Sequence, residues 1–437
     1  MSYKCIYNGT ILTMNEDRHI IEKGAIIIRD REIIEIGDCK ELLSKYHDCE
    51  MIDGKGGIIM PGFINGHCHV SMSLFRTLGE DVPDRLRKYI FPLEENIVDE
   101  KLVRVGAKLS MAEMILGGVT TFVDMYYYED EVAKVTKEMG MRAILGESVL
   151  NKKTPDSHKP YGGIDYSINF IEKWKKDDLI IPAIGPHATY TNDGEHLLKI
   201  KDIAHKYDVP ILMHLSEMDF EIERFKNEYG KTPIEYLDSI GFLCEKLIGA
   251  HCVYTTDNDM EILKKNRVSV IHNVGANAKS ARPIAPIHRM LKKDISVGIG
   301  TDGPMSGNHQ DIISVMHQYT KFQKVREGDR SIASALSAVE LGTIRGAKAI
   351  GLDKIIGSIE VGKRADIIII DTNTPNMLPL YDYYAGIVYG AYASNVTMTM
   401  VNGKVLMKDR KLLTTELSHI YDEVSQMKDI ILNMIKS

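Results

Sequence analysis

Five of the 15 histidines in this sequence stand at the ends of short apolar runs that are typical of buried strands. They are His67, His69, His187, His214 and His251. His67 and His69 are one residue apart, so on an extended backbone both imidazoles project to the same side and can bind one metal ion. Two solvated loop histidines explain an isolated His-x-His equally well. The pair therefore needs support from the rest of the chain.

Two carboxylates at strand ends extend the pattern. Glu217 follows His214 by three residues, where a carboxylate base and a ligand can share one metal-bound water. Asp302 ends the run GIGTDGP with no Lys or Arg beside it, and a buried carboxylate is costly unless a positive group compensates it. Three imidazoles and one carboxylate suit one Zn²⁺, with Fe²⁺ or Mn²⁺ as alternatives, and leave one position for water.

The pattern of apolar runs and turn residues predicts the strands and helices that position these residues. Short Ile-rich strands separated by Asn, Gly and Asp occur near both ends. Between them, eight apolar runs alternate with amphipathic helical patterns, which is typical of parallel βα units. We predict an α/β protein with a (β/α)₈ barrel over 58–356. A small β-sandwich domain would form from 1–57 and 357–437, the second part ending in a helix.

The barrel explains the position of the candidate residues, because active sites of this fold lie at the C-terminal ends of the strands. The alternative is an open doubly wound sheet, which would be expected to carry a glycine-rich phosphate loop after its first strand. Histidines stand there instead. The connection over 71–99 is long for a βα loop, so we expect it to act as a lid.

Charge and composition exclude other classes. Lys and Arg number 54 and Asp and Glu 61, which gives a net charge of −7, and the two signs are interspersed. No basic face for a nucleic-acid backbone is expected. The apolar runs are too short to cross a bilayer, and no secretory signal pattern is visible. The six cysteines suit a reducing compartment, so we expect a cytoplasmic protein, with homo-oligomer formation left open.

The motifs around these residues resemble a known family. They are PGFINGHCH at 61–69, HLSE at 214–217, AHC at 250–252, TDG at 301–303 and GSIEVGKRADIIIID at 357–371. Together they resemble the metal-dependent amidohydrolase superfamily over essentially the whole chain. Within it the chain looks most like the 5′-methylthioadenosine/S-adenosylhomocysteine deaminases and related chlorohydrolases. This finer likeness is carried by LFRTLGED at 74–81, FPLEE at 91–95, FVDMYY at 122–127 and GPHATY at 185–190.

The resemblance implies a role for each candidate. The ligands of the metal would be His67, His69, His214 and Asp302. Glu217 would carry the proton from water to a ring nitrogen of the substrate, and His251 and Asp302 would orient the water. One ion is expected, because LIIPAIGPHATY offers neither the modified lysine nor the carboxylate that bridges two ions in other members of the superfamily.

The resemblance also implies substrate contacts. Glu217 and His187 would contact the substrate, and Glu94 would accept hydrogen bonds from ribose hydroxyls. The ten other histidines are interpreted as background, including His272, for which core packing is the better interpretation. Cys68 and Cys252 alternate to the opposite side of their strands from the neighbouring histidines, so they are expected to pack and not to bind the metal.

The substrate prediction depends on positions that depart from the family pattern. They are Glu147 and Ile164, where relatives offer arginines to the S-adenosylhomocysteine carboxylate, and Val274 and Ala276 in the purine-facing wall. A carboxylate facing a carboxylate is repulsive. Arg85 and Arg282 are alternative basic groups. We therefore predict a hydrolytic deaminase of 5′-methylthioadenosine, adenosine or a related nucleoside. The alternatives are an aminohydrolase or chlorohydrolase of guanine, a pterin or a triazine, and a catalytically silent binding protein.

Overall fold

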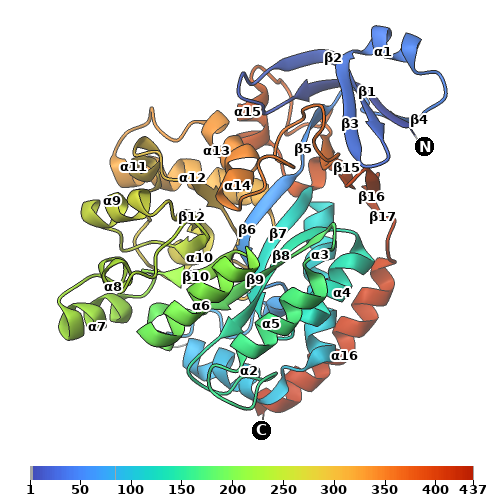
Figure 1. The fold of residues 1–437 in the computed structure, drawn as a ribbon. Coiled ribbons are helices and arrows are strands. Elements are labelled where there is room, and N and C mark those ends of the chain that lie inside the picture. Colours follow the sequence, from blue (N-terminus) through green and yellow to red (C-terminus); the bar gives the residue numbers. More distant parts are fainter. Residues whose placement is uncertain (1–2, 84, 437) are drawn as a thin grey trace. The chain divides into compact units, whose positions relative to one another are not determined.

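The computed structural model describes residues 3–83 and 85–436, and its strands form two sheets (Figure 1). The chain divides into two compact units. One unit contains residues up to 65 together with 112–121 and 311–415. The other contains 66–111, 122–310 and the residues from 416 onward. The fold class predicted from the sequence is confirmed, because a parallel eight-stranded sheet accompanies a mixed sheet built from both ends of the chain.

The mixed sheet has the strand order β17-β16-β15-β14-β5-β1-β2-β3, with β4 beside β1. Its strands are β1 (Tyr3–Leu12), β2 (Ile20–Arg29), β3 (Glu32–Asp38), β4 (Glu50–Asp53), β5 (Ile58–Pro61), β14 (Ile367–Ile370), β15 (Val396–Val401), β16 (Lys404–Lys408) and β17 (Lys411–Leu412). Ile59 pairs with Ile11 on one side and with Ile369 on the other. β5 therefore joins the strands from the two ends of the chain. The helix α1 (Cys39–Lys45) follows β3.

The parallel sheet has its strands in sequence order, β6 to β13. They are β6 (Phe63–Cys68), β7 (Val119–Tyr126), β8 (Arg142–Val149), β9 (Ile180–Pro186), β10 (Ile211–Leu215), β11 (Leu247–His251), β12 (Ser269–His272) and β13 (Val297–Ile299). The amide of Asp302 donates a hydrogen bond to the carbonyl of His67 at 3.0 Å. This bond brings the segment after β13 against the end of β6, as closure of a barrel requires.

Helices separate the strands. They are α3 (Glu100–Leu116), α4 (Glu129–Met139), α5 (Gly163–Trp174), α6 (Gly194–Tyr207), α7 (Asp219–Tyr229), α8 (Pro233–Ser239), α9 (Asp257–Lys265), α10 (Val274–Lys279), α11 (Ile287–Lys292), α12 (Ile312–Glu327), α13 (Ala335–Leu341) and α14 (Ile344–Ala349). Caps set several boundaries: the Thr256 hydroxyl, for example, accepts a hydrogen bond from the Asp259 amide and starts α9. α4 and α5 pack against β8 and β9 (Figure 1).

The first predicted barrel strand divides into two elements. The run from Ile58 to Pro61 is β5 of the mixed sheet, and the barrel strand β6 starts after Gly62. A Cβ at Gly62 would lie 2.1 Å from Cγ2 of Thr120, so only glycine fits there. Periodicity does not reveal this break, since both halves are continuously apolar. The domain boundaries at 57 and 356 stay predictions.

The long segment after β6 is partly helical. It contains η1 (Val70–Phe75), η2 (Leu86–Ile90) and α2 (Phe91–Ile97). The helix α16 (Leu417–Lys436) packs against η1, and Lys108 lies 3.2 Å from Glu423 on α16. Remaining short elements are η3 (Thr189–Thr191), α15 (Tyr383–Ala385), η4 (Gly386–Gly390) and η5 (Ala393–Asn395).

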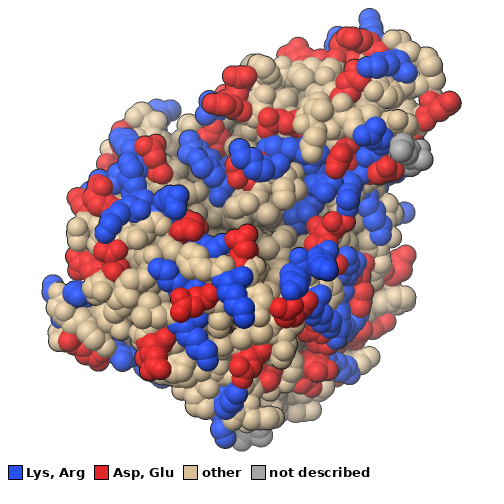
Figure 2. Space-filling view, in the orientation of Figure 1, with Lys and Arg blue, Asp and Glu red and all other residues tan. Residues whose placement is uncertain are grey.

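Two surface properties bear on function. Among the described residues, no helix combines the length and apolar character needed to cross a membrane. Lys and Arg are interspersed with Asp and Glu over the visible face, as Figure 2 shows. This face presents no continuous basic patch.

Candidate metal and active site

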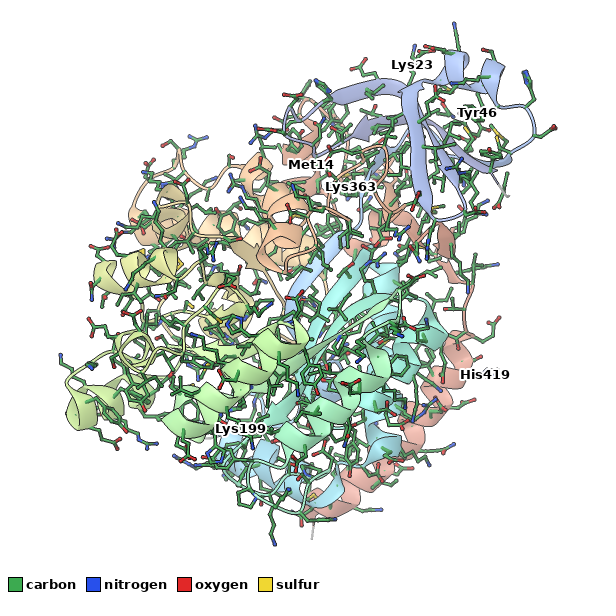
Figure 3. All side chains as sticks on the ribbon, viewed as in Figure 1. Met14, Lys23, Tyr46, Lys199, Lys363 and His419 are labelled. Carbon is green, nitrogen blue, oxygen red and sulfur yellow. The ribbon has the colours of Figure 1, made fainter. Side chains whose placement is uncertain are left out.

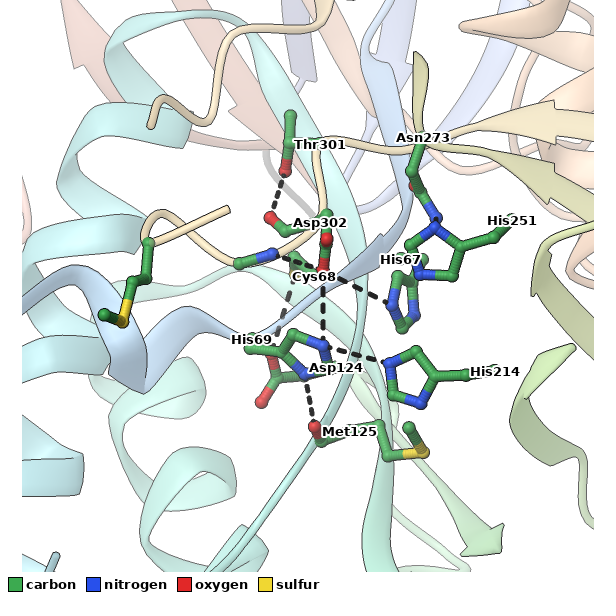
Figure 4. A network of polar contacts seen from close by, with 12 residues as sticks. His67, Cys68, His69, Asp124, Met125, His214, His251, Asn273, Thr301 and Asp302 are labelled. Carbon is green, nitrogen blue, oxygen red and sulfur yellow. Dashed lines mark hydrogen bonds and ion pairs between the residues drawn. The ribbon is translucent and has the colours of Figure 1, made fainter. Parts of the chain in front are cut away.

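Strand ends bring the predicted ligands together (Figure 4). Nε2 of His69 lies 3.3 Å from Nε2 of His214 and 3.3 Å from Oδ1 of Asp302. Nε2 of His67 lies 3.7 Å from the same Asp302 oxygen. Two groups have ligand atoms within 4.8 Å of one another: His67, His69 and Asp302 in one, and His67, His214 and His251 in the other. All five residues belong to one compact unit.

The chemistry of this donor set fits a metal ion. Nε2 of His67 is buried and has no hydrogen-bond partner among the described residues. Burial and the neighbouring imidazoles hold the pKa values of His67 and His214 well below the usual range. Neutral imidazole is the form that binds a metal. Burial would also lower the pKa of His69, but the hydrogen bond and charge of Asp302 outweigh it and raise that pKa to about 9.

The buried carboxylate of Asp302 is stable only with positive charge close to it. Burial opposes ionisation of Asp302, but the hydrogen bond from His69 and the charges of neighbouring histidines hold its pKa well below the usual value. A divalent cation among these imidazoles would supply that charge, as the sequence pattern requires.

Outer hydrogen bonds orient the rings. Nδ1 of His69 donates to the carbonyl of Met125 at 2.6 Å, and Nδ1 of His214 donates to the carbonyl of His187 at 2.8 Å. Both bonds leave Nε2 as the ligand atom. Asp302 has φ of 61° and accepts from the amide of Gly303 at 2.7 Å. The backbone conformation of Asp302 and the amide of Gly303 therefore orient this carboxylate, and neither can be recognised from the sequence.

Glu217 lies in the loop after β10, beside His251. Its Oε2 is 3.7 Å from Nε2 of His251, and its Oε1 is 3.0 Å from Nη1 of Arg282. The amide of Glu217 donates to Oε2 of Glu221 at 3.0 Å, which fixes its backbone. Nδ1 of His251 is 3.1 Å from Nδ2, the side-chain amide nitrogen, of Asn277. With that amide as donor, the proton of the ring lies on Nε2 and faces Glu217.

A cavity of about 640 Å³ opens beside these residues. His187 and Glu94 both line it, Glu94 from α2. Burial and the charge of His69 lower the pKa of His187 to about 3, so this imidazole is neutral at physiological pH. Burial raises the pKa of Glu94 to about 7. Each predicted site residue, the metal ligand His67 excepted, lines this cavity, and His67 lies directly behind it in the cluster.

The predicted specificity wall is wrong. Glu147, Ile164, Val274 and Ala276 are buried and do not line the cavity. Glu147 points to the outer side of β8, because side chains alternate along a strand and its neighbour Ser148 faces the cavity. Arg85 and Arg282, the alternative basic groups, do line the cavity. The expected repulsion between Glu147 and a substrate carboxylate therefore does not arise.

Sequence reasoning missed several residues of the site. Tyr126 and Tyr127 line the cavity, and Asn277 contacts His251. Tyr126 and Tyr127 belong to FVDMYY, one of the motifs that resemble the deaminases, but the sequence alone assigns neither tyrosine a role. Asn277 ends HNVGAN and lies on α10, and only the path of the chain after β12 brings it to His251 of β11.

The other histidines and the thiols do not line the cavity. His419 is exposed on α16 (Figure 3), and His272 is buried on β12 outside the cavity lining. The thiol of Cys68 donates to the carbonyl of Val123 at 3.3 Å, and Cys252 is fully buried. Burial raises the pKa of both thiols, which opposes thiolate ligation.

The fold is a parallel barrel whose strand ends gather imidazoles and a carboxylate that fit a metal ion, beside the second carboxylate of Glu217. Comparison with known proteins gives the family. The profile described as Amidohydrolase family matches residues 58–406, so the chain belongs to the amidohydrolase family. This confirms the resemblance stated from the motifs.

Individual relatives cover nearly the whole chain. A 5-methylthioadenosine/S-adenosylhomocysteine deaminase of Syntrophus aciditrophicus is 36% identical over 99% of this chain and 98% of its own. A 5′-deoxyadenosine deaminase of Methanobrevibacter smithii is 40% identical over 91% of this chain and 92% of its own. Among solved structures, an adenosine deaminase from Xanthomonas campestris with bound zinc superimposes with a TM-score of 0.96. It is 26% identical and 98% of each chain is covered.

Proposed function

We propose that this protein is a hydrolytic deaminase of adenosine-type nucleosides that works with one divalent metal ion and releases ammonia. The observation that carries the proposal is the convergence of three imidazoles and one carboxylate next to one cavity, close to the second carboxylate of Glu217. The deaminase relatives named above support the reaction class. Zn²⁺ is the first candidate, since a structural relative has zinc bound, and Fe²⁺ or Mn²⁺ are alternatives.

The proposed ligands are His67, His69, His214 and Asp302. When bound, the ion supplies Lewis acidity that brings the pKa of water toward neutrality. Nδ1–H of His69 and Nδ1–H of His214 donate hydrogen bonds to backbone carbonyls, so Nε2 of each ring is oriented as the metal ligand.

Glu217 is the proposed proton carrier. Its carboxylate takes a proton from water and gives it to a ring nitrogen of the purine. The carbon that bears the amino group gains the hydroxyl group of water, the remaining hydroxyl proton passes to the amino nitrogen, the C–N bond breaks, and the nitrogen leaves as ammonia. Nε2–H of His251 faces Oε2 of Glu217 and can donate a hydrogen bond to the oxygen that is added to the ring carbon.

His187 and Glu94 are the proposed substrate contacts in the same cavity. The neutral imidazole of His187 can donate or accept a hydrogen bond without introducing charge. Glu94 reaches the cavity from α2 and, when ionised, accepts hydrogen bonds from the ribose hydroxyls. Its pKa of about 7 implies that the ionised form becomes populated near neutrality, so ribose binding should strengthen as the pH rises through 7.

S-adenosylhomocysteine is a second candidate substrate. Arg85, Lys152 and Arg282 line the cavity, and Glu147 lies outside it. Three basic side chains in the lining, and a Glu147 outside it, support binding of a substrate carboxylate. The relative from Syntrophus aciditrophicus carries this compound in its name.

The test is ammonia release by the zinc-loaded protein from 5′-methylthioadenosine, 5′-deoxyadenosine, adenosine and S-adenosylhomocysteine, with guanine, a pterin and a triazine as comparison. We expect turnover of the adenosine compounds. Turnover of a comparison heterocycle alone would replace the proposal with that reaction. No turnover together with tight binding of a nucleoside would favour a binding protein.

The setting of the protein is also a proposal. Its partners are small molecules, and the interspersed charge supports neither a nucleic-acid nor a membrane partner. We propose a cytoplasmic location from the unpaired cysteines. Sedimentation would decide whether the protein forms a homo-oligomer.

A further inference from the structure

The side chain of Arg282 enters the cavity and ends on Glu217. Nη1 lies 3.0 Å from Oε1 of Glu217, and Nη2 lies 2.9 Å from Sδ of Met218. The side chains of Arg282 and Glu217 are 22% and 14% exposed. Arg282 stands between α10 and α11, so the ion pair joins the loop after β12 to the loop after β10. The proposed reaction gives this arginine no role.

The backbone of Arg282 is held in place. Its amide donates to the carbonyl of Asn277 at 3.0 Å, and the following Pro283 restricts it to an extended conformation. The side chain of Asn277 contacts Nδ1 of His251 at 3.1 Å, and Nε2 of His251 faces Oε2 of Glu217 at 3.7 Å. Glu217, Arg282, Asn277 and His251 therefore form a closed ring of contacts. The two oxygens of Glu217 face different groups of this ring.

We infer that Arg282 is a positioning residue for Glu217. Its guanidinium holds Oε1 and thereby turns Oε2 toward His251 and the reacting atoms. Arginine stays protonated at every physiological pH, so Arg282 takes no part in proton exchange. A glutamate side chain has several rotatable bonds, and ordering it before the substrate arrives removes that cost from the reaction. The inference rests on the proposed role of Glu217.

A different use of Arg282 is binding of a substrate carboxylate. The guanidinium contacts Glu217 and Met218 of the protein itself, which favours the positioning role. The two roles separate in kinetics. Loss of positioning lowers kcat for every substrate, whereas loss of a substrate contact raises KM for a substrate with a carboxylate only.

The experiment compares Arg282→Met and Arg282→Lys in the zinc-loaded full chain, with 5′-deoxyadenosine and S-adenosylhomocysteine as substrates. For Arg282→Met we expect kcat to fall roughly 10- to 100-fold with both substrates, with little change in KM for 5′-deoxyadenosine. Arg282→Lys should recover part of the loss, since it keeps the charge without the planar fork. Arg289→Met is the matched control, because Arg289 pairs with Asp257 at the surface and does not line the cavity.

Two further measurements make the inference decidable. If Arg282 acts through Glu217, Arg282→Met should add no loss in a Glu217→Gln background. A crystal structure of zinc-loaded Arg282→Met should show the Glu217 carboxylate turned away from His251. An unchanged Glu217 with normal kcat, or a rise in KM confined to S-adenosylhomocysteine, would overturn the inference. If Glu217→Gln alone stays active, the proposed function fails at that residue, and the crystal structure still decides whether Arg282 positions Glu217.

Discussion

At the scale of single residues, the site depends on which charges are buried and what faces them. Asp302 faces imidazoles and is ionised, whereas Glu147 is buried among other carboxyl groups. The amide of Glu129 donates to Oε2 of Glu147 at 3.2 Å, and Oε1 has no hydrogen-bond partner among the described residues. A buried carboxyl group is therefore ionised near one strand end and protonated at another, depending on the groups that face it.

Glu217→Gln tests the proton carrier directly. The amide has nearly the same shape but cannot accept a proton from water, so we expect kcat to fall by about 10²-fold or more. The zinc content, measured by metal analysis, should stay at the wild-type level because Glu217 is not a proposed ligand. Near-normal turnover would contradict the role.

Glu147→Gln tests the cost of the buried carboxyl. Burial and the charge of Asp156 raise the pKa of Glu147 well above its usual value, so the folded state holds a proton that the unfolded state has released. Stability is then complete below the unfolded pKa, near 4.3, and falls as the pH rises toward the folded pKa. The neutral glutamine avoids this loss.

We therefore expect Glu147→Gln to raise Tm at pH 8 by a few degrees, on the order of 1 kcal/mol, and by less at pH 5. Thermal unfolding followed by circular dichroism measures both values. Glu195→Gln, at an exposed position on α6, is the control and should show no pH-dependent gain. An equal shift at both pH values would show that the ionisation of Glu147 is not the cause.

At the scale of elements, one carboxylate joins the segment after β6 to the loops at the ends of other strands. Glu80 lies 2.5 Å from Nζ of Lys279, 2.9 Å from the side-chain nitrogen of Asn308 and 3.1 Å from Nη1 of Arg85. Lys279 ends α10, and Asn308 follows β13. These contacts place the predicted lid over the cavity that Glu80 and Lys279 both line.

Glu80→Gln should loosen this lid. The amide keeps a hydrogen bond to Asn308 but loses two ion pairs, each worth about 1 kcal/mol or less where partly exposed. We expect KM to rise about three- to tenfold, and amide exchange to increase over 71–99. Glu228→Gln, which breaks an exposed pair with Arg224 on α7, should change neither quantity. Unchanged exchange in Glu80→Gln would show that other contacts hold the lid.

At the scale of the whole molecule, the metal and the fold should be coupled. The cluster gathers residues from β6, β10, β11 and the segment after β13, so an ion that binds there favours the folded chain over the unfolded one. The same coupling makes binding sensitive to acid, because the imidazoles must be neutral to bind.

Removal of the metal should therefore lower Tm. Zinc at about 1,000 times its Kd contributes roughly 4 kcal/mol of stability. This gain should shrink once the pH falls far enough to protonate His67 and His214, whose pKa values lie well below the usual range. Scanning calorimetry with and without a chelator measures the difference. His205→Ala, at an exposed position on α6, should keep the full zinc-dependent gain, and His214→Ala should lose it. A zinc-independent Tm in the wild type would contradict the proposed site.

The features of the fold and the site that could be predicted from the sequence are those encoded by residues close together in the chain. The spacing of His67 and His69, and the alternation of apolar runs with amphipathic segments, predicted the barrel and its catalytic end, because strand ends of a barrel converge. The sheet shared by both ends of the chain was also predicted, from Ile-rich runs at each end. Each of these patterns is formed by residues close together in the sequence, so it can be recognised without the tertiary structure.

Tertiary structure alone decided the direction of side chains and the partners brought from distant loops. Glu147 was expected to face the substrate and instead faces away, because its neighbour Ser148 takes the cavity side. Arg282 was one of two alternative basic groups, and only the fold of the loops after β10 and β12 places it on Glu217. Residue types and spacing determine which chemistry is available, whereas the folded chain determines which charges meet, since that depends on contacts between residues far apart in sequence.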